Sequence, residues 1–190
     1  MPRKPNYDRN DLVKRARDLF WKQGWSGTSL KDLEAVLKMK PGSFYAAFGS
    51  KEALFELAMV KYTEDGIERL QKLSEEHGAA KTLQMFPAMV IGNEDAPAKA
   101  CMLAKTFLEL NAHGHPLAKK ANLHLSQMEA IFAELFEEAQ SDGTIGKTQD
   151  PAILARRYQS DLMGLRVSAE RDGINASEIA EEIAENLARI

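Results

Sequence analysis

The side chains in this sequence that are best suited to catalysis or metal binding are its four histidines and its single cysteine. His113 and His115 stand two residues apart in a turn that also contains Gly and Pro, and His124 follows on the next predicted helix. No Cys lies near them, and the sequence has no His-Glu-x-x-His spacing of the kind that binds zinc on a helix. We therefore interpret them as solvated histidines, and we predict no metal site, no cofactor and no catalytic residue.

Motifs for nucleophilic or nucleotide chemistry are also missing from the sequence. It contains no Gly-x-Ser-x-Gly, no phosphate-binding glycine loop and no Rossmann fingerprint. Four acidic residues near the C-terminus share the solvated face of a predicted helix and do not form a carboxylate cluster: Glu178, Glu181, Glu182 and Glu185. An enzyme remains only as an alternative, beside a helical adaptor protein that binds no DNA.

Contact with DNA is the chemistry that the stretch from Leu37 to Glu52 favours. Pro41 suits the first turn of a short helix, and Gly49 suits the position after its end. Phe44 and Phe48 are four residues apart and share one face, which leaves small side chains on the other. A short helix anchored by aromatic residues can enter a major groove when cations flank it, as do Lys38, Lys40 and Lys51.

The segment before this helix predicts a second short helix from residue 28 to residue 37. Thr28 or Ser29 can cap it, and Leu30, Leu33 and Leu37 keep helical spacing. About four residues then lead into the helix that begins at Pro41. Two short helices joined so closely are the signature of a helix-turn-helix unit.

Charge is distributed unevenly between this part of the chain and the rest. Residues 1–50 hold ten Lys or Arg and five Asp or Glu, for a net charge of +5, whereas the whole chain has a net charge of −3. A basic N-terminal part on an acidic body is expected when only the N-terminal part meets phosphates.

Residues 8–56 resemble the N-terminal domain of the tetracycline-repressor-type (TetR/AcrR) transcriptional regulators of bacteria. The resemblance is carried by Ala16, Phe20, Gly24 and Trp25, by Thr28-Ser29-Leu30, by the run from Gly42 to Phe48, and by the run from Ser50 to Leu54. It implies that the second and third helices form the DNA-binding unit. It also implies that the rest of the chain is an all-helical domain that dimerises and often binds an inducer.

Four positions depart from the pattern of the family, three of them in or beside the reading helix. The family often has Gly at the position of Lys38, Ser at that of Lys40, Lys at that of Pro41 and a larger polar residue, often His, at that of Ala47. These changes leave the expected fold unaltered and bear on the contacts to individual bases.

The remaining sequence predicts only helices, so the fold class is all-α with about nine helices. Residues 51–190 contain a long helix from Ser50 to about Glu76 and further helices over 79–91, 96–111, 117–140, 151–171 and 177–190. Pro87 is expected to kink or break the second of these. We predict a helix-turn-helix DNA-binding domain over residues 1–50 and a regulatory and dimerisation domain over residues 51–190.

Two groups of residues are predicted to contact operator DNA. Phosphates would be held by Thr28, Ser29, Tyr45 and Lys51, and bases would be faced by Lys40, Pro41, Gly42, Ser43, Ala46 and Ala47. The expected partners are operator DNA and a second copy of the chain. Apolar stripes on the last two helices, Leu154/Tyr158/Leu162/Leu165 and Ile179/Ile183/Leu187, predict the homodimer interface there.

Methionines spread over five helices of the body favour a cavity for a small-molecule effector, because Met adapts to irregular spaces. The alternative is that they fill gaps in an ordinary core. The residues expected to line the cavity are Met59, Tyr62, Met89, Cys101, Phe107, Met128 and Met163. Cys101, predicted about one turn inside a helix beside Lys105, is either core packing or a sensor of oxidants or electrophiles.

Together these features predict a cytoplasmic, ligand-responsive regulator of transcription, with no membrane-spanning segment. A repressor that an effector releases from a palindromic operator is favoured. The sequence leaves the operator, the regulated genes and the identity of the effector open.

Overall fold

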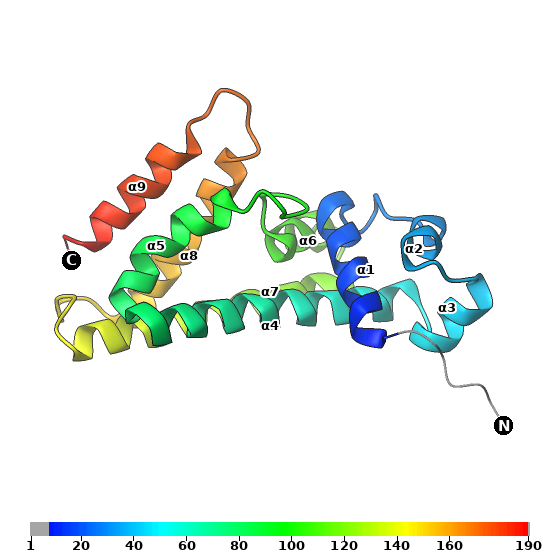
Figure 1. The fold of residues 1–190 in the computed structure, drawn as a ribbon, viewed down its shortest axis with the longest axis horizontal. Coiled ribbons are helices and arrows are strands. Elements are labelled where there is room, and N and C mark those ends of the chain that lie inside the picture. Colours follow the sequence, from blue (N-terminus) through cyan, green and yellow to red (C-terminus); the bar gives the residue numbers. More distant parts are fainter. Residues whose placement is uncertain (1–7, 190) are drawn as a thin grey trace.

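The computed structural model describes residues 8–189, and within them the chain forms helices and no strands, which confirms the predicted all-α class. Figure 1 shows an elongated molecule with the N-terminal helices at one end and the C-terminal helices at the other. The helices are α1 (Arg9–Gln23), α2 (Leu30–Leu37), α3 (Pro41–Phe48), α4 (Lys51–His77), α5 (Ala79–Gly92), α6 (Met102–Asn111), α7 (Pro116–Ser141), α8 (Pro151–Ser168) and α9 (Ala176–Leu187).

Local chemistry sets the bounds of the N-terminal helices. Asp8 caps α1 by accepting a hydrogen bond from the backbone N–H of Asn10, and Gly24 ends it with a φ of 79°. Ser29 and Asp32 form a reciprocal capping box at the start of α2. The predicted order of short helix, turn and second short helix is therefore confirmed.

Two long helices, α4 and α7, lie side by side along the long axis of the molecule (Figure 1). At one end they carry α1, α2 and α3. At the other end α5 and α8 pack on them, and α9 packs mainly across α5. α6 lies between the two ends and packs on α7.

The buried apolar residues form two clusters. One lies at the N-terminal end and joins Phe20, Leu33 and Phe44 to Phe55 of α4 and to residues of α6 and α7. The other joins α5, α8 and α9 to the C-terminal halves of α4 and α7. The first cluster contains residues from both sides of the domain boundary predicted at residue 50. Residues of α4 occur in both clusters, so this helix is part of the core at each end.

α5 continues through Pro87, so of the kink or break expected there, the break is wrong. Pro87 has no N–H to donate to the carbonyl of Leu83, four residues earlier. The hydroxyl of Tyr158 from α8 donates to that oxygen instead, at 2.7 Å. A tertiary contact thus satisfies the acceptor that the proline leaves open.

The predicted helix over residues 96–111 is also wrong at its start, because α6 begins only at Met102. Glu170, in the turn that follows α8, accepts hydrogen bonds from the backbone N–H groups of Lys99 and Ala100, at 2.7 and 2.8 Å. The carbonyl of Lys99 accepts from Arg166 of α8 and that of Ala100 from Trp21 of α1, both at 2.7 Å. These three side chains thus bond to backbone groups that would otherwise pair within a helix.

Of the helices described, none combines the length and the hydropathy needed to cross a membrane.

Candidate nucleic-acid interface

α3 presents an open face of small side chains to solvent. Phe44 and Phe48 are buried beneath it, whereas six residues predicted to contact DNA are exposed: Lys40, Pro41, Gly42, Ser43, Tyr45 and Ala46. Ala47, a seventh, is half-buried. A Cβ added at Gly42 would meet nothing within 4 Å, so packing does not require a glycine there. This face leaves room for the backbone of α3 to approach another molecule closely.

The turn between α2 and α3 depends on an unusual backbone at Lys38. Lys38 has a φ of 55° and a ψ of 42°, the left-handed conformation, and no other non-glycine residue from 8 to 189 has a positive φ. Its N–H and that of Met39 bond back to carbonyls of α2. Glycine adopts this conformation without strain, which gives a physical reason for the glycine common in similar sequences.

Two of the predicted phosphate contacts are occupied within the protein. The Thr28 side chain is buried and donates to the carbonyl of Gly24 at 2.8 Å, so its hydroxyl is not available to a phosphate. Ser29 is exposed, but its hydroxyl lies 2.5 Å from the Asp32 carboxylate and accepts from the Asp32 N–H at 3.2 Å. The hydrogen bonds from Ser29 lower the pKa of Asp32. Both residues therefore position α2.

Lys51 also has a structural role in this conformation. Its Nζ donates to the carbonyl of Trp25 at 2.6 Å and lies 4.0 Å from the centre of a Trp25 ring. Burial lowers the pKa of Lys51, although Glu52 and Glu109 act in the opposite direction. Lys51 thus fixes the turn after α1.

Sequence reasoning did not assign phosphate contacts to three further cations of this surface. Lys31 and Lys38 are exposed and form no ion pair with any residue from 8 to 189. Arg9 is exposed as well, with its guanidinium 5.8 Å from the centre of the Phe48 ring. For Lys31, the sequence did hold a signal of a phosphate contact, because this residue lies in the first turn of the helix predicted over residues 28–37.

α6 is bonded directly to the turn that follows α1. Glu109 accepts from the backbone N–H groups of Ser26 and Trp25, at 2.7 and 3.1 Å. Lys105 donates to the carbonyl of Trp21 at 2.9 Å. Burial tends to raise the pKa of Glu109, but the hydrogen bonds from Ser26 and Trp25 outweigh it and lower that pKa. The helix-turn-helix is therefore held by α6 through charged side chains.

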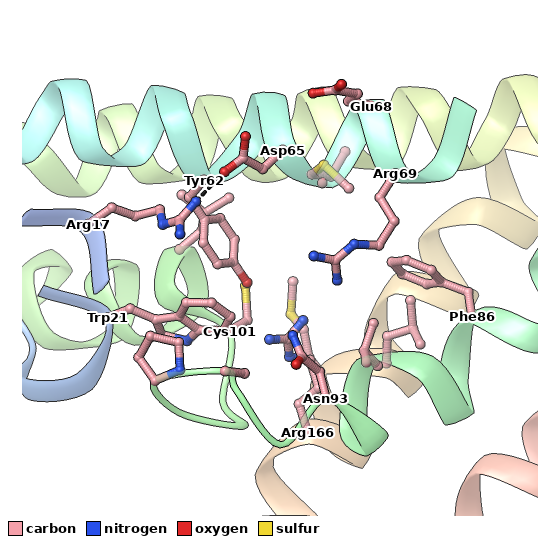
Figure 2. Close-up of a pocket in the computed structure, with 18 of the residues that line it drawn as sticks. Arg17, Trp21, Tyr62, Asp65, Glu68, Arg69, Phe86, Asn93, Cys101 and Arg166 are labelled. Carbon is pink, nitrogen blue, oxygen red and sulfur yellow. Dashed lines mark hydrogen bonds and ion pairs between the residues drawn. The ribbon is translucent and has the colours of Figure 1, made fainter. Parts of the chain in front are cut away.

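A cavity of about 730 Å³ lies between the N-terminal helices and the C-terminal end. α1, α4, α5, α7, α8 and the loop before α6 contribute to its walls, and Figure 2 shows its interior. Four of the seven residues predicted to line a cavity do so: Tyr62, Cys101, Met128 and Met163. These four residues come from four different parts of the wall: α4, the N-cap of α6, α7 and α8.

The other three predicted lining residues belong to the packed cores. Met59 is fully buried in the N-terminal cluster, Phe107 packs against the same cluster, and Met89 packs against the C-terminal cluster. For these three the gap-filling alternative describes the structure.

Charged residues of the cavity wall were missed by sequence reasoning. They include Arg17 and Asp18 from α1, Asp65 and Arg69 from α4, and Arg166 from α8. Arg17 forms ion pairs with its neighbour Asp18 and with Asp65, and the second of these links α1 to α4. Charged side chains on amphipathic helices are usually solvated, so no sequence signal separated these from ordinary surface residues.

Cys101 is the N-cap of α6 and not a residue inside the helix. The Tyr62 hydroxyl donates to its Sγ at 3.6 Å, and burial raises the pKa of Tyr62. Lys105, expected beside Cys101, reaches α1 instead. The wrong start predicted for α6 accounts for the error.

The histidines have structural contacts or are exposed. His115 accepts from the N–H of Leu117 at the start of α7, and His124 lies 2.9 Å from Gln127. His113 is exposed. Within residues 8–189, no three His, Cys, Asp or Glu side chains gather as metal ligands would.

The two short helices, the buried aromatic anchors and the open face of α3 define a helix-turn-helix DNA-binding protein. Comparison with known proteins agrees. A family model described as bacterial regulatory proteins, tetR family, matches residues 12–58. The HTH-type transcriptional regulator YezE of Bacillus subtilis is 28% identical over 180 residues, which cover 90% of this chain and 93% of YezE. The transcriptional repressor ComR of Escherichia coli is 25% identical over 178 residues, covering 91% and 84% of the two chains.

A solved structure extends the likeness to the whole chain. It contains a cysteine-substituted variant of the TetR family transcriptional regulator CifR bound to 26-bp double-strand operator DNA. It superposes with a TM-score of 0.79 and 26% identity, covering 100% of this chain and 98% of that one. The present chain belongs to the tetR family and is a transcriptional regulator. The matched proteins are regulators and not enzymes, as was expected of this chain.

Proposed function

We propose that the protein is a homodimeric repressor that binds a palindromic operator through α3 and releases it when an effector occupies the cavity. The single observation that carries the DNA-binding part is the exposed face of α3, from Lys40 to Ala46, over buried Phe44 and Phe48. The Ala46 methyl can contact a thymine methyl, and Lys40 can donate to guanine. ComR, a relative at 25% identity, is a repressor, which supports the sign of regulation.

Phosphate contacts are assigned to the exposed cations Arg9, Lys31 and Lys38 together with Tyr45, which is 48% exposed. Ser29 keeps its proposed phosphate contact, because it is exposed at the start of α2. Lys51 contacts a phosphate only by leaving Trp25. Thr28 acts by holding the turn. Each phosphate contact releases counterions, so operator affinity falls steeply with salt.

In a dimer through the last two helices, α8 would meet its partner through a face other than the predicted stripe. Leu154, Tyr158, Leu162 and Leu165 are buried within the protomer and cannot face a partner. The opposite side of α8 carries an exposed stripe at helical spacing: Ile153, Arg157, Ser160, Gly164 and Val167. Ile153 and Val167 are 56% and 55% exposed, and nothing lies within 4 Å of a Cβ placed on Gly164. Apolar ends around a small centre allow two α8 helices to pack closely.

We further propose that residues 1–50 bind DNA while residues 51–190 dimerise and sense, with α4 shared between the two cores. In this arrangement the protein acts in the cytoplasm, where the operator is. The cavity has the size of small-molecule sites and includes wall residues of α1, so an effector there touches the DNA-binding part directly.

The experiment is footprinting of the DNA upstream of the protein's own gene, followed by a gel shift with the protected fragment. A protected palindrome, bound specifically and less tightly as salt rises, is expected. Light scattering at micromolar concentration should give a dimer, and Val167→Glu should give a monomer with unchanged helicity. No protection by a folded dimer would contradict the operator assignment, and a wild-type monomer would contradict the interface.

A further inference from the structure

Two arginines reach into the cavity from different walls without a charged partner. Figure 2 shows the guanidinium groups of Arg69, from α4, and Arg166, from α8, turned toward the open space. Neither forms an ion pair with any residue from 8 to 189. Arg166 donates from Nε to the carbonyl of Lys99, which leaves its two terminal nitrogens for another acceptor. A cation facing a partly enclosed space without a partner favours an anion there.

The acidic residues of the cavity wall are not available to a ligand in the same way. Asp18 and Asp65 are paired with Arg17, and Asp65 is also 2.7 Å from Lys61. Hydrogen bonding by Asp65 raises the pKa of Lys61, as expected of a formed ion pair. Glu68 and Asp95 are exposed, and Figure 2 shows Glu68 pointing away from Arg69. Among wall residues without an ion pair to any residue from 8 to 189, the cations Lys14, Arg69 and Arg166 outnumber these two acids, so the remaining charge of the wall is positive.

The remainder of the wall is largely apolar. It includes Phe86 from α5 and Phe132 from α7, whose ring centres are 6.0 Å apart, as well as Met128 and Met163. The volume of about 730 Å³ falls in the range that accommodates small organic ligands. A planar guanidinium fork matches a carboxylate, and an apolar wall matches a hydrocarbon or aryl body.

We propose that the effector is an organic monoacid whose carboxylate binds Arg69 and Arg166 and whose apolar body packs against Phe86 and Phe132. This inference rests on the proposed function for the release of DNA, whereas ligand binding itself can be measured without DNA. Arg166 also connects the site to α1: it bonds to the Lys99 carbonyl, and the next carbonyl, Ala100, accepts from Trp21 at 2.7 Å. A carboxylate bound to Arg166 therefore competes for a side chain that holds this loop. It changes the affinity for DNA to the extent that it binds one conformation of the loop more tightly than another.

The test is calorimetric titration of the dimer with probes that share one apolar body and differ in their charged group. 4-Phenylbutyrate is the acid, with 4-phenylbutyramide as the neutral analogue and 4-phenylbutylamine as the cation, and decanoate is a second acid with an alkyl body. The acids should bind at least about tenfold more tightly than the amide and the amine, the worth of one hydrogen bond to a charged group. Arg69→Gln should remove that preference, and because Arg69 makes no side-chain hydrogen bond within residues 8–189, folding should be unaffected.

Two further variants keep the result interpretable. Arg171→Gln changes an exposed arginine that does not line the cavity and should leave the preference intact. Arg166→Lys keeps a positive charge but loses the planar fork, so the acids should bind more weakly than to the wild type.

Equal affinity for acid, amide and amine would overturn the proposal. So would the absence of heat with both acids at millimolar concentration, or an unchanged preference in Arg69→Gln. Operator binding by the unliganded protein is scored separately: its failure would refute the proposed regulatory function, whereas a charge preference lost in Arg69→Gln would still establish the anion site.

Discussion

The hydroxyl of Tyr158 donates a 2.7 Å hydrogen bond to the carbonyl of Leu83, the acceptor that Pro87 leaves unpaired in α5. Both partners lie in the C-terminal core, and burial raises the pKa of Tyr158 far above its ordinary value, so the hydroxyl keeps its proton. One side chain of α8 thus allows a proline inside a buried helix. The contact locks α5 and α8 together at the end of the molecule remote from α3.

Tyr158→Phe should destabilise the protein by about 1–3 kcal/mol, because it leaves a buried carbonyl unsatisfied. In a Pro87→Ala background the same change should cost less, since the N–H of the new residue can donate to Leu83. Urea unfolding of the four proteins at one protein concentration measures the coupling. Equal costs in the two backgrounds would contradict this account of Pro87.

Glu109→Gln should weaken the connection between α6 and the turn after α1. Trp25 and Ser26 donate to different oxygens of the carboxylate, and Gln replaces one of these oxygens with an NH2 group that cannot accept. The loss should be about 1 kcal/mol because the site is partly solvated. The folded-state pKa of Glu109 is lowered, so its stabilisation is complete above the ordinary value of 4.5 and is lost as pH falls below it.

The stability difference between wild type and Glu109→Gln should therefore be present at pH 7 and should shrink progressively as the pH falls below 4.5, as measured by chemical unfolding. Glu134→Gln, on the exposed side of α7, is the matched control and should show no difference at any pH. A difference that persists unchanged in acid would show that the carboxylate charge is not what holds the turn.

Lys38→Gly and Lys38→Ala should separate backbone strain from charge. Both variants lose one cation, so both should bind operator more weakly, with a log–log salt slope reduced by about 0.9 if Lys38 contacts one phosphate. Only Lys38→Gly relieves the left-handed backbone, which should make it more stable than Lys38→Ala by about 1 kcal/mol. Thermal unfolding of the two variants checks this. Equal stabilities would mean that the turn tolerates a side chain at no cost.

Features set by neighbouring residues were predictable from the sequence. Pro41 and Gly49 bound α3, Ser29 starts α2, and the four-residue spacing of Phe44 and Phe48 identified the buried side of the reading helix. These features depend on capping, glycine conformation and helical periodicity, which operate within a few positions of the chain.

Features set by distant residues were not predictable. The late start of α6 results from Glu170 and Arg166, about seventy residues further along the chain, which bind the backbone at Lys99 and Ala100. Arg69 and Arg166 also follow the polar pattern of solvated helix faces. They meet at one cavity only because α4 and α8 both pack on α7. Long-range pairing of this kind leaves no local pattern.

The central claim, that the exposed face of α3 binds operator DNA, is tested most directly by Ala46→Glu. Ala46 is exposed over buried Phe44, so the change should leave folding and dimerisation intact while placing a carboxylate against the groove. Fluorescence anisotropy with the footprinted fragment, at one fixed salt concentration, is the measurement, with Ala130→Glu on the exposed side of α7 as the control. We predict at least about a 100-fold loss of affinity for Ala46→Glu and wild-type affinity for the control. Wild-type affinity in a folded Ala46→Glu dimer would show that α3 does not read the operator.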